Sequence, residues 1–283
     1  MRVLITGSSG RIGHAVAQAI ALTHDVVGLD LVAAPHTNII GSITDNALVA
    51  RTVRGVDAII HTAALHAPHV GNYSADQFKT VNVRATESLL DAAIGGGVKR
   101  FVFTSTTSIY GDAMVDPSRA VWVTESLTPI ARDIYDETKL AAESACDAAA
   151  RAGLPCISLR MSRCFPEPED LLAIYRLYRG VDARDVAAAH RLAVESPLAG
   201  FEVFNVSAAT PFGESDVVDL KRDAAAVIRR SYPWVDDEFA RRGWALPVTI
   251  DRVYVVEKAR RMLGYQPQYG FESLFPGRTN SLA

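Results

Sequence analysis

Cysteine is scarce in this sequence of 283 residues, and it contains no long apolar run. The three cysteines, Cys146, Cys156 and Cys164, form no CxxC pair. Their odd number and wide spacing exclude a disulfide framework and favour reduced thiols in the core of a cytosolic protein. The apolar run at residues 3–5 is too short for a signal peptide or a membrane span. We therefore expect a cytoplasmic protein without a membrane partner.

Long runs of one charge are also missing, and the formal net charge is −3. A basic surface for nucleic acid is therefore not expected, and nucleic acid is not expected as a partner. The sequence is 49% hydrophobic and 22% charged, which is typical of a globular protein. Its length fits one large domain or one domain with a smaller appendage.

The first half of the sequence alternates short β-branched runs with helix-like stretches. The expected strands are almost continuously apolar, as are strands buried on both faces of a parallel sheet. Strand, helix and strand repeated in this way predict an α/β fold with a doubly wound parallel sheet. We expect strands at residues 2–6, 25–30, 38–40, 57–61, 100–104 and 156–160, and helices at residues 11–22, 45–53, 75–93 and 135–151.

The pattern changes after residue 160, where prolines and glycines cluster at residues 197–200, 211–213 and 264–270. Helices are expected at 184–194, 215–230 and 253–263, and a strand at 201–206. We therefore divide the chain into residues 1–160 and a smaller lobe at residues 161–283, interleaved with the last strands of the sheet.

A glycine-rich loop, GSSGRIG at residues 7–13, follows the first expected strand and opens a helix. Gly7 allows a tight turn, Gly10 lets the backbone approach a pyrophosphate, and Gly13 lets the helix pack closely on the sheet. Backbone N–H groups at the helix N-terminus would face the phosphates. The loop predicts a dinucleotide site, and a loop that only turns tightly is the alternative. Its expected cofactor contacts are Gly7, Ser9, Gly10, Arg11, Ile12 and Gly13.

Asp30 ends the second expected strand, 17 residues after Gly13. A carboxylate at this place can accept hydrogen bonds from both hydroxyls of the adenosine ribose and would repel a 2′-phosphate. No Arg or Lys follows in residues 31–34. The sequence therefore predicts NAD as cofactor in preference to NADP, and an Asp that only caps a loop is the alternative.

The sequence YDETK at residues 135–139 places Tyr135 and Lys139 four residues apart on an expected helix, so that they share a face. A lysine ammonium and a positively charged nicotinamide would lower the pKa of the phenol. Tyr135 could then exchange a proton with an alcohol oxygen near neutral pH. Thr106 follows the fifth strand, at the edge where such sheets bind ligands. A surface Tyr/Lys pair and ordinary loop roles for the Ser/Thr cluster are the alternatives.

Together these residues resemble the extended short-chain dehydrogenase/reductase family, also called the NAD-dependent epimerase/dehydratase family. The resemblance extends over nearly the whole chain. Its matching segments are TGSSGRIG at residues 6–13, Asp30, HTAA at 61–64, Asn82-Val83, TSTTSIYG at 104–111, Tyr135 with Lys139, VDARDVA at 181–187 and RMLGYQP at 261–267.

The resemblance implies that residues 1–160 are an NAD-binding Rossmann domain. It puts Thr106 in the place of the catalytic Ser/Thr, Tyr135 in that of the acid/base and Lys139 in that of its partner. Ala63 and Ala64 would line the cofactor channel, and Asn82 would mainly shape its helix. A homodimer through the helices at residues 75–93 and 135–151 is also implied. Further expected cofactor-binding residues are Ile43, Ala63, Ala64, Asn82, Tyr135 and Lys139.

Two departures from the family narrow the chemistry. Thr107 and Ser108 stand where the family's sugar-nucleotide 4,6-dehydratases carry an acidic pair, so dehydration is disfavoured. Only about 20 residues separate Arg160 from Val181, where the nucleotide-sugar enzymes have a long insertion. A small substrate is therefore expected.

The segment LRMSRCFPEP at residues 159–168 is similar to the matching segment of uronate dehydrogenases, which oxidise free hexuronic acids at C1. Those enzymes place a carboxylate-binding arginine shortly afterwards, where this chain has Leu171 and Leu172. Arg163 or Arg176 could take over that role, and a surface arginine is the alternative. A small polar alcohol or lactol, such as a sugar or sugar acid, is the expected substrate. Its expected contacts are His66, Thr107 and Arg163.

Some residues carry weaker signals. His61, His66 and His69 fit no zinc spacing, and no Cys or carboxylate cluster accompanies them, so no metal is expected. Trp234 and Trp244 are expected in the core of the lobe.

Three functions remain open from the sequence. The first is a dehydrogenase that passes hydride to NAD. The second is an epimerase, which oxidises and then reduces the same carbon and keeps its NAD bound. The third is an NAD-sensing protein without catalysis, which the fold alone does not exclude. The intact set of Thr106, Tyr135 and Lys139 favours an enzyme over a sensor.

Overall fold

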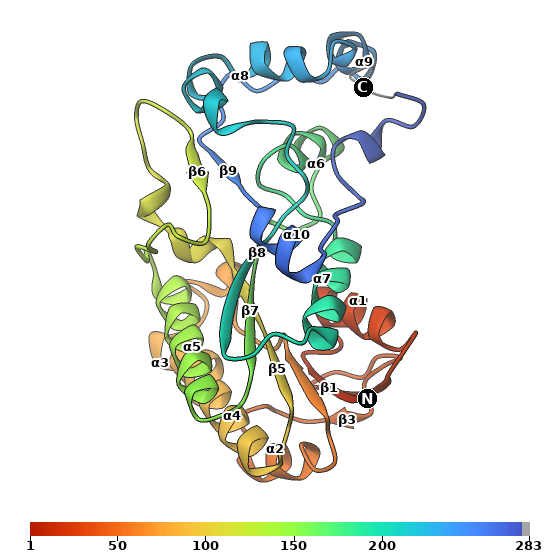
Figure 1. The fold of residues 1–283 in the computed structure, drawn as a ribbon, viewed down its shortest axis with the longest axis vertical. Helices are drawn as coiled ribbons and strands as arrows, with labels where there is room; N and C mark the ends of the chain where they lie inside the picture. Colours follow the sequence, from red (N-terminus) through yellow and green to blue (C-terminus); the bar gives the residue numbers. More distant parts are fainter. Residues whose placement is uncertain (279–283) are drawn as a thin grey trace.

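A parallel sheet of seven strands forms the centre of the protein (Figure 1). The computed structural model describes residues 1–278. The strand order is β3-β2-β1-β4-β5-β7-β8, and every neighbouring pair is parallel. This confirms the predicted doubly wound α/β fold. The strands are β1 (Arg2–Thr6), β2 (Asp25–Asp30), β3 (Ile39–Ile40), β4 (Ala58–His61), β5 (Arg100–Thr106), β7 (Cys156–Met161) and β8 (Phe201–Val206).

Helices cover both faces of the sheet because successive residues of each strand point to opposite sides. On β1, Val3 and Ile5 pack into a core with α1 (Arg11–Ile20), α7 (Ala183–Glu195) and α10 (Glu257–Leu263). Leu4 points the other way, into a core with α2 (Asn46–Thr52), α4 (Ala85–Gly95) and α5 (Ile134–Arg151). The near-continuous apolar strands of the sequence thus correspond to two cores on either side of one sheet.

The helix expected at residues 75–93 is interrupted. It consists of α3 (Ala75–Lys79), a π-helical turn at Thr80–Arg84, and α4. The buried side chain of Asn82 lies in this turn and bonds the backbone of Leu65 through both its oxygen and its nitrogen, each at 2.8 Å. Through Asn82, the irregular turn therefore fixes the loop that follows β4. The periodicity of the sequence does not predict this contact.

The helix expected at residues 253–263 begins too early. Residues Arg252–Tyr254 form β9, which pairs in parallel with β6 (Val121–Val123), and α10 starts only at Glu257. The prediction was wrong here because β9 finds its partner some 130 residues away along the chain, a pairing that local patterns do not encode.

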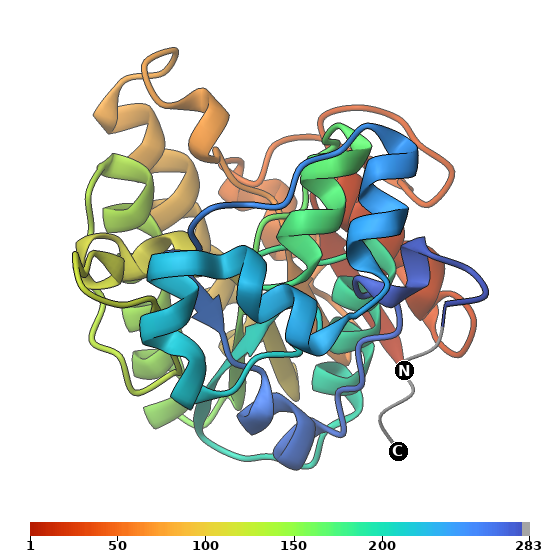
Figure 2. The same cartoon turned by 90° about the horizontal axis from the view of Figure 1, so that it is seen from above.

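A lobe sits over the carboxyl ends of the sheet strands (Figures 1 and 2). It contains the β6–β9 pair with α6 (Glu169–Arg176), α8 (Val217–Ser231) and α9 (Val235–Arg242). Of these elements, β6, α6 and α9 were not expected from the sequence. Trp234 and Trp244 pack against its core, which includes Phe239 and Phe271. β8 belongs to the sheet although it follows residue 160, so the two parts are interleaved in the chain.

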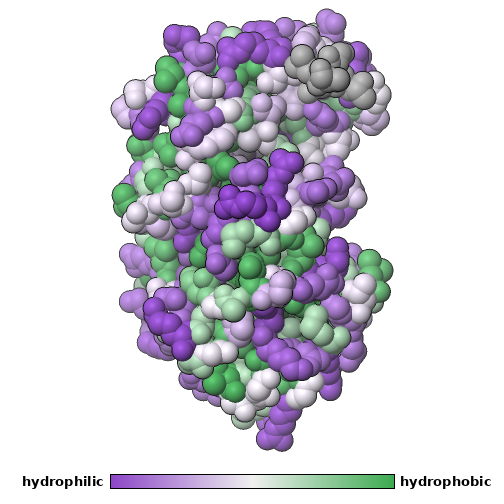
Figure 3. All heavy atoms as spheres, viewed as in Figure 1, coloured by the Kyte–Doolittle hydropathy of each residue, from purple (hydrophilic) through white to green (hydrophobic). Residues whose placement is uncertain are grey.

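The surface shown in Figure 3 mixes hydrophilic and hydrophobic side chains, with more hydrophobic ones over the sheet-bearing part than over the outer end of the lobe. Within residues 1–278, every helix is too short or too polar to cross a lipid bilayer.

Candidate active site

A cavity of about 1030 Å³ lies between the carboxyl ends of the strands and the lobe. The glycine-rich loop, the ends of β2, β4 and β5, the start of α5, and the segments after β7 and at β9 all contribute to its lining. This is the edge at which doubly wound sheets bind ligands. Most residues that the sequence singled out meet here, namely Gly7, Gly10, Arg11, Ile12, Gly13, Asp30, Ile43, Ala63, Ala64, His66, Thr106, Thr107, Tyr135, Lys139 and Arg163.

The glycine-rich loop leaves no room for side chains at two of its positions. Gly7 has φ +74°, and a Cβ there would come within 2.7 Å of the backbone nitrogen of Ala63. A Cβ on Gly13 would come within 1.9 Å of the carbonyl oxygen of Gly7. Both glycines are therefore required by the turn and by the close packing of α1. The resulting cradle of backbone at the N-terminus of α1 fits the diphosphate of a dinucleotide.

Asp30 lines the cavity and also holds the loop together. Its two carboxylate oxygens accept hydrogen bonds from the backbone N–H groups of Ser9 and Val32, at 3.0 and 3.2 Å. Asp30 therefore caps the loop and also faces the cavity. Its hydrogen bonds to the loop backbone orient the carboxylate. Ser9, in contrast, is not part of the cavity lining, because its hydroxyl turns away to donate to the carbonyl of Val32.

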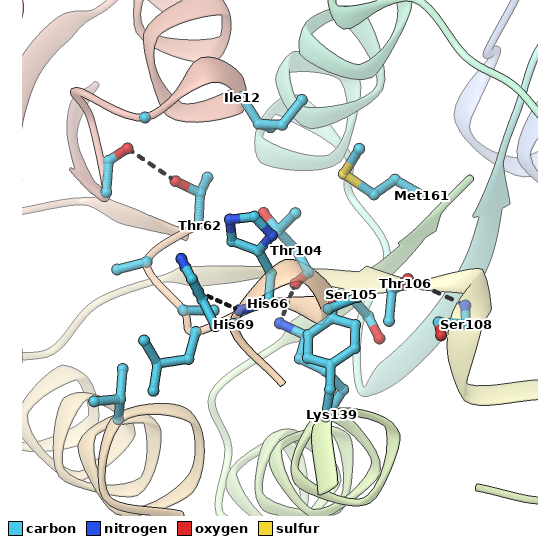
Figure 4. A pocket seen from close by; sticks show the side chains of 18 of the residues that line it. Ile12, Thr62, His66, His69, Thr104, Ser105, Thr106, Ser108, Lys139 and Met161 are labelled. Carbon is cyan, nitrogen blue, oxygen red and sulfur yellow. Dashed lines mark hydrogen bonds between the residues drawn. The ribbon is translucent and has the colours of Figure 1, made fainter. Parts of the chain in front are cut away.

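Lys139 is buried beneath the end of β5. Its Nζ donates a hydrogen bond to the carbonyl oxygen of Thr104 at 2.6 Å and lies 4.0 Å from the centre of the Phe103 ring (Figure 4). Asp133 caps the helix by accepting from the backbone N–H of Asp136 at 2.9 Å, which fixes where α5 starts. The first turns of α5 therefore hold Tyr135 and Lys139 at the cavity wall.

Thr106 ends β5 and faces the phenol of Tyr135, to which it is hydrogen-bonded. Its Oγ1 also accepts from the backbone N–H of Ser108 at 3.1 Å (Figure 4). The strand end and the helix thus bring together the hydroxyl and the phenol that the sequence placed about 30 residues apart.

Burial is the largest influence on the pKa values of Lys139 and Tyr135. It lowers the pKa of Lys139 to about 8, although the nearby charge of Glu143 opposes the shift. It raises the pKa of Tyr135 above the ordinary value, with smaller raising effects from Asp136 and Asp133 and an opposing effect from the Thr106 hydrogen bond. The expectation that Lys139 lowers the pKa of Tyr135 is therefore not met by the protein alone, in which desolvation dominates.

The loop after β4 forms another part of the wall. His66 and His69 both line the cavity, with ring centres 4.2 Å apart, and the backbone N–H of His66 donates to Nδ1 of His69 at 3.0 Å (Figure 4). Burial lowers the pKa of His66, so the neutral imidazole is favoured. Asn82 does not line the cavity but ties this loop down through Leu65, which makes it a positioning residue.

His61 lies away from the cavity. It is buried between the hydroxyls of Thr6 and Thr86, at 2.6 and 2.9 Å, and burial lowers its pKa to about 3. Within residues 1–278 there is no group of three or more His, Cys, Asp or Glu side chains that could hold a metal ion.

The lobe side of the cavity carries several arginines. Arg163 lines it and pairs with Glu167, whereas Arg176 is buried outside the lining and pairs with Asp182 at 2.9 Å. Arg176 is therefore not available as the substitute considered above. Arg132, Arg179 and Arg252 line the cavity as well. Sequence reasoning missed these three because they belong to no motif and only the fold brings them together.

Comparison with known proteins supports the features just described. The family model for the NAD dependent epimerase/dehydratase family matches residues 3–169, more than half of the chain. The chain belongs to this family. The match covers the glycine-rich loop, Asp30, Thr106, Tyr135 and Lys139, and it confirms the resemblance and the NAD cofactor expected from the sequence.

Two curated relatives show the range of this family. The chain is 34% identical to a 3-beta-hydroxysteroid dehydrogenase of Mycolicibacterium neoaurum, over half of this chain and 41% of that protein. It is 26% identical to a UDP-glucose 4-epimerase of Corynebacterium glutamicum, over 95% of this chain and 92% of that protein. The chain thus spans less than half the length of the steroid dehydrogenase.

Solved structures share the fold. A short-chain dehydrogenase/reductase superfamily protein of Agrobacterium tumefaciens with bound NAD has a TM-score of 0.72 at 24% identity, covering 97% of this chain and 94% of its own. A mutated uronate dehydrogenase has a TM-score of 0.70 at 19% identity, covering 100% of this chain and 89% of its own. At these identities the likeness shows that the overall fold is shared.

Proposed function

We propose that this protein is an NAD-dependent oxidoreductase that transfers hydride between NAD and a small polyhydroxy substrate, a sugar or a sugar acid. The observation that carries the proposal is the meeting of Thr106, Tyr135 and Lys139 at the wall of the cavity that also contains the glycine-rich loop. Each of the three is held by the scaffold rather than placed on a mobile loop.

The residues present fit the cofactor. The backbone cradle at Gly7 and Gly13, which a Cβ would fill, can hold the diphosphate, and the carboxylate of Asp30 can bind the adenosine ribose. When bound, NAD supplies the acceptor for the hydride. Its other proposed contacts are Arg11, Ile12, Ile43, Ala63 and Ala64 along the cavity, with Ser9 and Asn82 acting on the loops behind it.

The proton is handled by residues of this chain. Thr106 and Tyr135 bind the reacting oxygen of the substrate, and the Tyr135 phenolate takes the proton of the alcohol as the C–H electron pair leaves. In the reverse direction the phenol returns the proton to the carbonyl oxygen. Lys139 is held by its hydrogen bond to the carbonyl oxygen of Thr104, and together with the positive charge of a bound nicotinamide it would favour the phenolate against the effect of burial. His66, Thr107 and Arg163 are the proposed substrate contacts.

The test is NADH absorbance after mixing purified protein and NAD with hexuronic acids, aldoses and polyols. NADH formed with one class of substrate, and lost in Tyr135→Phe, supports the dehydrogenase. The second candidate is an epimerase, favoured by the epimerase relative that covers 95% of the chain. Formation of the epimeric product without accumulation of NADH would support the epimerase. NAD binding with neither reaction would favour the NAD-sensing protein.

We also propose that the protein is a cytoplasmic homodimer. The compartment is supported by three free, buried cysteines.

The proposed dimer interface consists of α4, with α3 before it, and α5. These helices lie side by side on one face of the sheet (Figure 1). Residues 1–160 and 161–283 are the proposed cofactor and substrate parts. Light scattering with Ala141→Arg on α5, compared with wild type, tests the interface.

A further inference from the structure

The proposed proton transfer needs a positive charge on Lys139, and burial opposes that charge. The side chain is 4% exposed. Its Nζ contacts the carbonyl oxygen of Thr104 at 2.6 Å and the ring of Phe103 at 4.0 Å, neither of which carries a net charge. Burial of an ammonium favours the neutral amine, and it lowers the pKa of Lys139 to about 8. A carboxylate nearby would stabilise the ammonium form.

Glu143 is placed to supply this negative charge. It lies four residues after Lys139 on α5, and both side chains belong to the buried face of that helix. The charge of Glu143 raises the pKa of Lys139, against the effect of burial. Cys146 lies on the same face, but burial raises the pKa of its thiol well above the ordinary value, so the thiol is neutral.

The carboxylate of Glu143 is fixed by β7. Nη2 of Arg160 donates a hydrogen bond to Oε2 at 2.7 Å, and Nε donates to Oε1 at 3.1 Å. The hydroxyl of Ser158, on the same strand, donates to Oε1 at 2.8 Å. All three side chains are buried. A guanidinium that binds both oxygens leaves the carboxylate one orientation.

Arg160 is in turn held from the side of the lobe. Its Nη1 donates to the hydroxyl of Tyr110 at 3.1 Å, and its guanidinium carbon lies 5.0 Å from the centre of that ring. The Tyr110 hydroxyl donates to Oδ1 of Asn205 at 2.8 Å, and Nδ2 of Asn205 donates to the carbonyl oxygen of Val123 in β6 at 3.2 Å. A continuous set of hydrogen bonds therefore extends from the lobe to Glu143.

Stability alone is a poor explanation for a buried ion pair between Glu143 and Arg160. Removing two charges from water costs free energy, and apolar side chains of similar volume are often as stable in such a place. Apolar side chains would not, however, provide a negative charge one helical turn from Lys139. Glu143 lies outside the cavity lining, so it does not contact a substrate there.

We propose that Glu143 is a positioning residue that keeps Lys139 in the ammonium form, and that Arg160 and Tyr110 hold its carboxylate in place. The inference rests on the oxidoreductase function proposed above and deepens it, because the ammonium is the form of Lys139 that favours the phenolate of Tyr135. Glu143 acts on the reaction through Lys139.

Other titratable groups also surround Lys139. Burial is the main cause of the lowered pKa of the two histidines among them, and the charge of Lys139 lowers it further, so that the neutral rings are favoured. Glu143 is the anionic member of the set. The remaining members are Tyr135 and Cys146 on α5, His61 at the end of β4 and His66 on the loop after it.

The test measures the protonation of Lys139 directly. The chain has five lysines, so in protein with ¹³C-labelled lysine the Cε signal of Lys139 can be assigned with Lys139→Met and followed by NMR between pH 6 and 11. Wild type should titrate at about pH 8. In Glu143→Gln the titration should move about one pH unit lower. Glu143→Gln/Arg160→Met, which leaves no unpaired charge from this pair, should show a shift in the same direction.

Asp147→Asn is the matched control. It removes a carboxylate from the same helix, where Asp147 pairs with the exposed Arg151 at 2.8 Å, and the titration of Lys139 should not change. An equal shift in this control, or an unchanged titration in the double variant, would overturn the proposal. So would a wild-type Lys139 that already loses its proton below pH 7, an outcome that requires no variant to fold.

Steady-state kinetics provide a second measurement. At alkaline pH, kcat/KM for substrate oxidation should decline as Lys139 loses its proton, and this limb should begin at lower pH in the double variant. A role limited to stability would leave the limb in place, which would contradict the proposal. If Lys139 titrates as expected but no substrate yields NADH, the oxidoreductase proposal fails, and the effect of Glu143 on the charge of Lys139 stands.

Discussion

Asp136 follows Tyr135 directly on α5 and is completely buried, and its carboxylate is held by Arg132 through the backbone N–H at 3.3 Å and Nε at 3.5 Å. The same guanidinium donates from Nη2 to the hydroxyl of Ser108 at 3.3 Å. Since the backbone of Ser108 donates to Thr106, a continuous set of hydrogen bonds joins this buried carboxylate to the hydroxyl beside the phenol.

The first prediction concerns the pH dependence of turnover. The negative charges of Asp136 and Asp133 raise the pKa of Tyr135, so removing one of them should lower it. In Asp136→Asn, which keeps an acceptor for Arg132, the limb of the pH–rate profile that reports the phenolate should move to lower pH by about one unit. The measurement is kcat/KM for substrate oxidation between pH 6 and 10.

The control for this prediction is Glu137→Gln, which removes a charge from the exposed side of the same helical turn. Both variants retain Asp133, which also acts on the pKa of Tyr135, and the charged or titratable cavity residues Lys139 on α5, Arg132 before it and His66 on the loop after β4. A profile that shifts equally in the two variants would mean that the local charge of Asp136 does not act on Tyr135.

The second prediction concerns the hydroxyl of Thr106. Replacing it in Thr106→Val removes the partner of the Tyr135 phenol and a donor to the reacting oxygen, which should lower kcat by about 10²- to 10³-fold. Thr106→Ser keeps the hydroxyl and should retain most of the activity. The comparison requires steady-state kinetics and a thermal unfolding curve for each variant. Similar rates for Val and Ser would remove Thr106 from the catalytic group.

The third prediction concerns the choice of cofactor. Asp30→Asn keeps one acceptor oxygen for the backbone N–H groups of Ser9 and Val32 but removes the charge that would repel a 2′-phosphate. The affinity for NADP relative to NAD should therefore rise at least tenfold, measured by fluorescence titration with NADPH and NADH. Asp25→Asn, on an exposed position at the other end of β2, should leave the ratio unchanged. An unchanged ratio in Asp30→Asn would contradict the assignment.

The fourth prediction concerns acid stability. His61 and His190 are completely buried, and burial lowers their pKa to about 3 and about 4. Free histidine titrates near pH ~6.5, so the unfolded chain binds protons that the folded protein does not. The stability that the neutral rings provide is complete above pH ~6.5 and is lost as the pH falls toward these lower values, by up to about 1.4 kcal/mol per pH unit for each ring.

Urea unfolding between pH 7 and 5 tests the contribution of His190, whose Nε2 meets Thr104 Oγ1 at 2.8 Å. The free energy of unfolding of wild type should decline more steeply with falling pH than that of His190→Asn. Parallel slopes would show that His190 is not kept neutral by the fold.

Much of the cofactor half could be predicted from the sequence, because its signals are local. The glycines of residues 7–13 meet the needs of a tight turn, and the spacing of Tyr135 and Lys139 places both on one face of a helix. Each signal lies within a few residues of chain. The bounds of β1 and β2 follow from apolar runs in the same way. These elements appear in the structure where the sequence placed them.

The rest depends on contacts between distant segments. Arg179 and Arg252 lie 73 positions apart in the sequence and share the neighbourhood of Asp251 only after β9 has paired with β6. Asn82 lies in a π-helical turn and bonds Leu65, 17 residues earlier in the sequence. Neither relationship leaves a periodic or spaced pattern in the sequence, so the sequence pointed to Arg163 but not to Arg132, Arg179 and Arg252.

The position of β8 has a consequence for dissecting this protein. β8 contributes the last strand of the sheet and covers the outer edge of β7 along six residue pairs. A fragment that ends at residue 160 would leave that edge with free N–H and C=O groups, and exposed edges of this kind recruit other chains. The cofactor half therefore depends on the chain beyond it for solubility, and a shortened version would be expected to self-associate rather than to bind NAD as a monomer.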